Sequence, residues 1–192
     1  MSTNAVRKYT LEEYITIEEA SEIKHEFRDG QILAMAGASP SHTFILADLV
    51  YLLRTQLKPT GCRIGSADMR VRISPEGRYC YPDVVVVCGT PVFDDTKPQA
   101  LINPTLIIEV LSDSTAAYDR GDKFHDYRQV PSLTDYVLVA QDRAYLEHYQ
   151  RQGESDLWLY QSAEGLDATL VLAGLNLSLP LVDVYAQVDN IA

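Results

Sequence analysis

Two acidic residues interrupt runs of apolar residues that otherwise have the composition of buried β-strands. Asp83 precedes the run of four valines in YPDVVVV at residues 81–87, and Glu109 lies in LIIEVLS at residues 106–112. An ionised carboxylate is costly to bury unless a cation or metal ion meets it. If the two strands are neighbours, the carboxylates approach closely and need a divalent cation or a raised pKa. Hard oxygen ligands of this kind suit Mg²⁺ or Mn²⁺.

A cationic side chain follows Glu109 on the next predicted element. Lys123 and Arg120 fall in a predicted helix within residues 114–130, and a helix packed back on its own strand can turn Lys123 towards the two acids. A lysine there could hold an attacking water or stabilise charge on a phosphoryl oxygen. The sequence also allows a simpler reading, in which each acid is solvated at a strand end and Lys123 pairs with Asp119 one helical turn away.

Hydrophobic periodicity, caps and turn signals predict the elements that position these residues. Thr10 and Glu13 fit a capping box for a helix that runs to about Phe27, and Asp29–Gly30 predicts a turn. The other predicted segments are strands at 31–37, 69–74, 78–87 and 101–112, a helix from 39–41 to 59–61, a loop at 89–104, strands at 134–142, 144–151 and 155–163, and a final strand with a short amphipathic end. This order predicts a mixed α/β (α+β) fold in which helices flank a central mixed sheet that continues into a C-terminal β meander. We expect residues 1–192 to form a single domain.

The charge distribution bears on nucleic-acid binding. A net charge of −11 argues against a non-specific coat on nucleic acid, because attraction to phosphate is the main term in such binding. Residues 54–78 nevertheless carry six basic and two acidic side chains, a local charge of +4. Arg70 and Arg72 lie in this stretch, and we name them with Arg120 as candidate substrate contacts. A solvated charged face is the alternative.

Cysteine spacing and hydropathy limit the other classes of protein. Cys62, Cys80 and Cys88 form no CxxC pair and are odd in number, so we expect plain buried or half-buried thiols, without a disulfide framework or a zinc site. No apolar run approaches the roughly 18 residues of a membrane span, and the N-terminus lacks the apolar stretch of a secretory signal. We therefore expect a cytoplasmic protein with no membrane partner.

Several segments, taken in order, make the chain resemble the PD-(D/E)XK nuclease superfamily. The resemblance is closer to its restriction-endonuclease-like "Uma two" family. The matching segments are HEFRDGQI at 25–32, ASPSH at 38–42, YPDVVVV at 81–87, NPTLIIEVLSDST at 103–115 and DRGDKFHDYRQVPSLTDYVLV at 119–139. No single segment is specific. The ordered set is, and it covers about two-thirds of the chain.

The resemblance implies a restriction-endonuclease-like fold and a metal site. It implies that Asp83 and Glu109 bind Mg²⁺, with Glu26, on a helix before the first strand, completing the site. The lysine that usually follows the Glu by two residues is replaced by Leu111. The resemblance implies that Lys123, on the next helix, takes its place.

Three further positions matter for the resemblance. His42 matches a histidine of the family pattern, and we name it as a candidate substrate contact. Tyr81 stands where relatives usually carry an acidic or polar residue, and Asp113 stands where they usually carry Pro. Neither change removes a metal ligand, although Asp113 adds negative charge near the expected phosphate position.

Two hypotheses follow for the function. The first is a Mg²⁺- or Mn²⁺-dependent endonuclease that hydrolyses DNA, with Asp83, Glu109 and Glu26 at the metal and Lys123 acting on the water or the developing charge. The second is a nuclease fold kept as a binding or assembly module without turnover, which the acidic balance, Leu111 and Asp113 favour. Because cutting a duplex needs two cleavages, a homodimer is a natural arrangement, and the apolar meander around Trp158 is the candidate interface.

Overall fold

The computed structural model describes residues 7–35, 37–74, 77–112, 115–153 and 155–191. Asp113 therefore lies outside the described residues. The elements are α1 (Leu11–Ala20), β1 (His25–Arg28), β2 (Gln31–Ala34), α2 (Pro40–Leu57), η1 (Lys58–Thr60), β3 (Arg63–Ser66), β4 (Val71–Ser74), β5 (Arg78–Cys80), β6 (Val84–Val87), β7 (Leu106–Leu111), α3 (Ala116–Tyr118), η2 (Asp119–Lys123), α4 (Phe124–Tyr127), β8 (Asp135–Ala140), β9 (Tyr145–Arg151), β10 (Trp158–Glu164), β11 (Thr169–Leu172), η3 (Ala173–Leu175), β12 (Leu177–Pro180) and α5 (Leu181–Val184).

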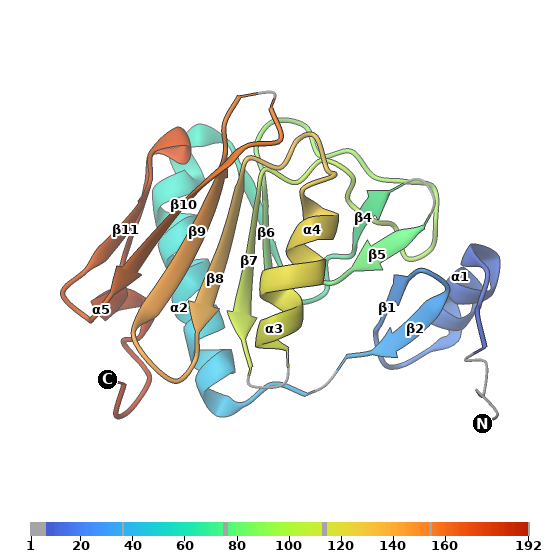
Figure 1. Ribbon diagram of the computed structural model, residues 1–192, viewed down its shortest axis with the longest axis horizontal. Coiled ribbons are helices and arrows are strands. Elements are labelled where there is room, and N and C mark those ends of the chain that lie inside the picture. Colours follow the sequence, from blue (N-terminus) through green and yellow to red (C-terminus); the bar gives the residue numbers. More distant parts are fainter. Residues whose placement is uncertain (1–6, 36, 75–76, 113–114, 154, 192) are drawn as a thin grey trace.

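A six-stranded sheet in the order β10-β9-β8-β7-β6-β3 forms the centre of the molecule (Figure 1). The pair β7 and β8 is parallel, and the α3–η2–α4 helix crosses over between these two strands. The other paired strands of this sheet are antiparallel. The predicted mixed sheet flanked by helices is confirmed, and β8, β9 and β10 form the predicted meander.

Helices cover both faces of the sheet, which explains why all four valines of β6 are buried. On one face, Val84 and Val86 belong to the core that contains Ile45 and Leu49 of α2. On the other face, Val85 and Val87 share a core with Tyr127 of α4. In Figure 1 the α3–η2–α4 helix lies in front of the sheet and α2 lies behind it.

A smaller sheet in the order β2-β1-β5-β4 stands at one end of the molecule beside α1 (Figure 1). The predicted first helix has the expected Thr10 capping box but ends at Ala20, so its extension to Phe27 was wrong. Asp29 and Gly30 have positive φ values of 51° and 83°, which form a tight hairpin turn. This turn pairs β1 with β2. Glu26 therefore lies on a strand, and its expected place on a helix was also wrong.

The cysteines differ from the sequence-based expectation. The register between β3 and β6 places Arg63 opposite Val87, so Cys62 and Cys88 stand just beyond this pair. They form a disulfide, with 4.2 Å between their Cα atoms. The expectation of plain thiols was therefore wrong for this pair, because sequence spacing does not reveal strand register. Cys80 is free and buried, as expected.

The remaining elements close the far side of the core. The hairpin of β11 and β12 and the short helix α5 contribute Leu170, Leu179 and Val184 to the core under α2. Among the described residues, no helix has the length and apolar character needed to cross a membrane.

Candidate active site

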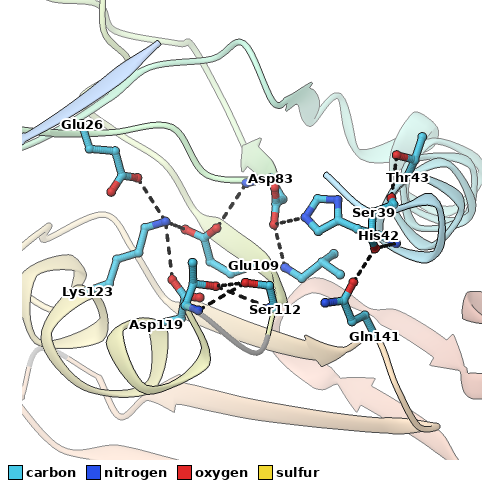
Figure 2. A network of polar contacts seen from close by, with 12 residues as sticks. Glu26, Ser39, His42, Thr43, Asp83, Glu109, Ser112, Asp119, Lys123 and Gln141 are labelled. Atoms are coloured by element: carbon cyan, nitrogen blue, oxygen red, sulfur yellow. Dashed lines mark hydrogen bonds and ion pairs between the residues drawn. The ribbon is translucent and has the colours of Figure 1, made fainter. Parts of the chain in front are cut away.

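The register of the central sheet brings the two predicted acids together. Strands β6 and β7 are antiparallel with Val84 opposite Ile108, which places Asp83 beside Glu109. The Asp83 backbone N–H lies 3.4 Å from Glu109 Oε2, and the Val110 N–H donates to Asp83 Oδ2 at 2.7 Å. Figure 2 shows both carboxylates at this end of the strands. The backbone itself therefore fixes the orientation of Asp83.

Lys123 extends from the crossover helix into the same site (Figure 2). Its Nζ lies 2.8 Å from Glu109 Oε1, 3.2 Å from Glu26 Oε1 and 3.7 Å from Asp119 Oδ1. The residue is only 6% exposed. It ends the π-helical turn η2, a form that is common at functional sites. Both the strand pairing expected for the acids and the i,i+4 pairing with Asp119 therefore occur in the structure.

Burial and crowding of like charges shift the pKa values of the cluster. Burial, with the nearby Asp83 and Asp119, raises the pKa of Glu109 to about 8 although Lys123 opposes this shift. Burial also raises the pKa of Asp119. Burial alone would lower the pKa of Lys123, but the surrounding acids, led by Glu109 and Glu26, raise it well above its usual value. Lys123 is therefore an ammonium group that contacts three carboxyl groups, with Asp83 next to one of them, Glu109.

His42 joins the cluster from α2. Ser39 caps this helix by accepting a hydrogen bond from the His42 N–H, with Pro40 in the first turn. His42 Nε2 lies 3.1 Å from Asp83 Oδ2, and this hydrogen bond raises the pKa of His42. Its Nδ1 is buried and has no hydrogen-bond partner among the described residues. His42 thus contacts Asp83, a predicted metal ligand, whereas the sequence analysis named it as a candidate contact for the substrate itself.

Several supporting residues were not identified from the sequence. Tyr127 donates a hydrogen bond to Glu109 Oε1 at 3.0 Å, and the Tyr81 N–H lies 3.4 Å from Glu26 Oε1. Glu18 accepts hydrogen bonds from the Tyr81 hydroxyl at 2.8 Å and from the His25 N–H. In the sequence, Glu18 is recognisable only as an acid on the apolar side of a predicted helix. Its hydrogen bonds to Tyr81 and His25 become evident only from the fold.

The three candidate arginines lie outside this cluster. Arg120 pairs with Glu147, with 2.6 Å between Nη2 and Oε1. Arg70 is 1% exposed, and its guanidinium contacts Thr96, Pro98 and the ring of Tyr79, so it stabilises the 94–101 loop and has no surface for a substrate. Arg72 lies 3.7 Å from Asp94.

The acids of the cluster differ from a preformed metal site in the described part of the chain. Within it, no three His, Cys, Asp or Glu side chains are arranged to hold a metal ion. Lys123 Nζ lies between the acids that would otherwise face one another. The structure therefore brings together Glu26, Asp83, Glu109 and Lys123, while their roles stay predictions.

The architecture places the chain in the class of nuclease-fold proteins. It matches the crystal structure of a "putative nuclease belonging to DUF820" from Anabaena variabilis with a TM-score of 0.73. The match covers 92% of this chain and 97% of that one at 18% sequence identity. At this low identity the match establishes the fold alone.

Sequence comparison then identifies the family. Residues 11–181 match the model of the Uma2 family, described as "Putative restriction endonuclease", and the chain belongs to this family. Two relatives from Synechocystis sp. are each 38% identical to the chain. "Uncharacterized protein sll1609" matches over 84% of this chain and 90% of its own length, and "Uncharacterized protein slr1290" over 93% and 92%. The family resemblance expected from the ordered segments is thus confirmed.

Proposed function

We propose that this protein is a metal-dependent endonuclease that hydrolyses phosphodiester bonds in DNA. The observation that carries the proposal is the contact of Lys123 with Glu109, whose neighbour across the strand pair is Asp83. A strand-borne acid pair with an ammonium group beside it is suited to bind a cation and to stabilise charge developing on a phosphoryl oxygen. Membership of a family described as restriction endonucleases supports the same reaction class.

The carboxylate donors of the cluster suit a divalent cation by their chemistry, while Lys123 Nζ lies between them and the described side chains are not arranged around one metal position. The cluster contains four carboxyl groups, from Glu26, Asp83, Glu109 and Asp119, and one ammonium, so the site has excess negative charge when the acids are ionised. Burial, with a smaller contribution from Asp83 and Asp119, raises the pKa of Glu109, and a bound cation would favour its ionised form. Asp83 and Glu109, with Glu26, would hold Mg²⁺ or Mn²⁺, which supplies a Lewis acid and a more acidic water.

The protein side chains have separate tasks in this proposal. Lys123 orients the attacking water or stabilises charge on the phosphoryl group, and the Glu26 carboxylate keeps its amine in position. His42 is a positioning residue, because its hydrogen bond to Asp83 Oδ2 adds to that from the Val110 N–H and fixes the carboxylate. The burial of the cluster lowers the local dielectric and strengthens each of these interactions.

Cleavage assays test the proposal directly. Supercoiled plasmid and oligonucleotide DNA are incubated with Mg²⁺ or Mn²⁺ and the wild-type protein, the Asp83→Ala variant or the Asp167→Asn variant. Asp167 is an exposed acid before β11 and is the matched control. We expect cleavage by wild type and Asp167→Asn, with loss of activity in Asp83→Ala. Equal cleavage by all three proteins, or none on any DNA substrate, contradicts the proposal.

A second candidate function is a binding or assembly module without turnover. The observation that favours it is the position of Lys123, which already neutralises part of the acid cluster where a metal would bind. Calorimetric titration with Mn²⁺ separates the two functions. Binding that is lost in both Asp83→Ala and Glu109→Ala supports the nuclease, whereas no binding at millimolar Mn²⁺ supports the module.

A further inference from the structure

A cavity of about 340 Å³ lies at the end of the parallel strand pair. Leu111 and Ala140, the last residues of β7 and β8, form part of its lining, and Ala116 and Arg120 of the crossover helix form another part. Gln141 and Arg143 contribute from the turn after β8. Its volume falls at the lower end of the range for small-molecule sites, about 300–1,000 Å³. The carboxyl ends of parallel strands are a frequent place for ligands in α/β proteins.

The cavity lies on the same face of the sheet as Glu109. Side chains alternate along a strand, so Leu111 points to the same side as Glu109, about 6–7 Å further along β7. Gln141 connects the cavity to the candidate active site, because it accepts a hydrogen bond from the Ser39 hydroxyl at 2.6 Å, and Ser39 caps the helix of His42. Figure 2 shows Gln141 next to this end of α2. The cavity therefore borders the end of α2 that carries His42.

Two arginines, Arg120 and Arg143, line the cavity together with one acid, the exposed Asp142. Glu147 accepts a hydrogen bond from Arg120 Nε at 2.7 Å and lies 2.6 Å from Nη2, so the orientation of this guanidinium is fixed and Nη1 is left outside the ion pair. Arg143 is exposed, and its guanidinium stacks 4.7 Å from the ring centre of Tyr145. Within the described part of the chain Arg143 has no ion pair. Planar guanidinium groups match the geometry of phosphate oxygens.

We propose that this cavity is a subsite for the sugar–phosphate backbone of the nucleic-acid strand next to the bond that is cut, with Arg143 and Arg120 as its phosphate contacts. This proposal rests on the proposed nuclease function, because it assigns the cavity to the part of the substrate strand next to the bond that is cut. A chain with a net charge of −11 needs local cations to hold a polyanion, and in this cavity Arg143 is the cation outside the Arg120–Glu147 pair. In this proposal Arg120 contacts the substrate, as the sequence analysis expected, but at a place separate from the acid cluster.

Binding without cleavage is the appropriate test. A fluorescein-labelled oligonucleotide is titrated in EDTA, and anisotropy gives Kd at several salt concentrations for wild type, Arg143→Ala, Arg143→Lys and Arg120→Ala. We expect Arg143→Ala to weaken binding about three- to tenfold, and to reduce the slope of log K against log salt by about one. Arg143→Lys should keep the salt slope, since it retains the charge. Arg7→Ala is the control, because Arg7 is an exposed arginine just before α1, outside residues 54–78 and outside the cavity lining.

Each outcome has a defined meaning. Weaker binding by Arg143→Ala and Arg120→Ala, with Arg7→Ala unchanged, supports the subsite. Wild-type binding that none of these variants alters overturns it, and so does the absence of binding by the wild type. If binding depends on Arg143 but the metal-loaded protein cuts no DNA, the subsite stands and the proposed nuclease function fails.

Discussion

The buried ammonium of Lys123 is the residue on which the cluster depends most. It contacts three carboxyl groups and is only 6% exposed, so neither it nor its partners can be hydrated as freely as surface charges. Removing one partner from such a network leaves uncompensated buried charge, which costs much more than a surface ion pair. Lys123 therefore has a structural role in addition to the proposed catalytic one.

Replacing Lys123 by methionine tests this structural role. We expect Lys123→Met to lower the free energy of unfolding by about 3 kcal/mol near neutral pH. The loss should be smaller at pH 5, because the carboxyl groups left without a cation then take up protons. Urea unfolding at the two pH values measures both effects. An equal loss at both values contradicts the electrostatic explanation.

The pKa of Glu109 predicts a pH dependence of stability. Its pKa is raised from an ordinary value of 4.5 to about 8, so the folded state prefers the protonated carboxyl. The stability gained from that preference is fully present below about pH 4.5 and is lost as the pH rises towards 8, by an amount on the order of a few kcal/mol. In Glu109→Gln, which cannot ionise, the decline across this range should be shallower. Unfolding curves from pH 5 to 8 measure the difference, and parallel curves contradict it.

At the scale of elements, the sequence is most informative where periodicity is strong. The four valines of β6, the apolar face of α2 and the capping box at Thr10 all produce the expected elements. The end of α1 was predicted wrongly, because Glu22–Glu26 reads as helical although the Asp29–Gly30 turn makes hairpin pairing available. Tertiary pairing outweighs local helix propensity here.

The π-helical turn η2 gives a test at the same scale. Gly121 lies inside this turn, and an added Cβ would meet no atom within 4 Å. We therefore expect Gly121→Ala to stabilise the protein by about 0.5–1 kcal/mol, because alanine loses less backbone entropy in a helix. Gly77→Ala is the contrasting control, since Gly77 has φ of +97° and its Cβ would lie 3.1 Å from Leu11 Cδ1. Thermal unfolding of both variants should show shifts of opposite sign.

At the scale of the whole molecule, the candidate site joins the two larger sheets. Glu26 comes from the smaller sheet, whereas Asp83, Glu109 and Lys123 belong to the central sheet and its crossover helix. Arg28 and Arg78 of the smaller sheet both reach Asp126 of α4, and Arg28 Nε lies 2.9 Å from its carboxylate. These ion pairs hold Glu26 at its place beside Lys123.

Asp126→Asn tests this connection. Asp126 is 1% exposed and pairs with both arginines, which keep only the more exposed Asp29 and Asp122 as partners in Asp126→Asn, so we expect a destabilisation of about 1.5–3 kcal/mol. Hydrogen exchange should rise in β1 and β5, while β7 and β8 keep their protection. Asp122→Asn is the control, because Asp122 also pairs with Arg28 but is exposed, and little change is expected. Uniform loss of protection in all four strands contradicts the predicted role.

The sequence predicted the acid pair and Lys123, but it could not predict how the parts of the site fit together. Asp83 and Glu109 are recognisable because acids are rare in buried strands. The ion pairs of Asp126, the Cys62–Cys88 disulfide and the Glu18 network depend on strand register and on contacts between distant segments. Neither composition nor spacing contains that information.

The burial of Lys123 also determines how amine-specific reagents modify the protein. Lys8, Lys58 and Lys97 are exposed, whereas the Lys123 amine is enclosed and protonated. Acylating reagents attack an accessible, unprotonated amine, so peptides containing Lys123 should stay unlabelled in the folded protein and become labelled after denaturation. Mass spectrometry of the modified peptides would thus follow the integrity of this one site without any substrate.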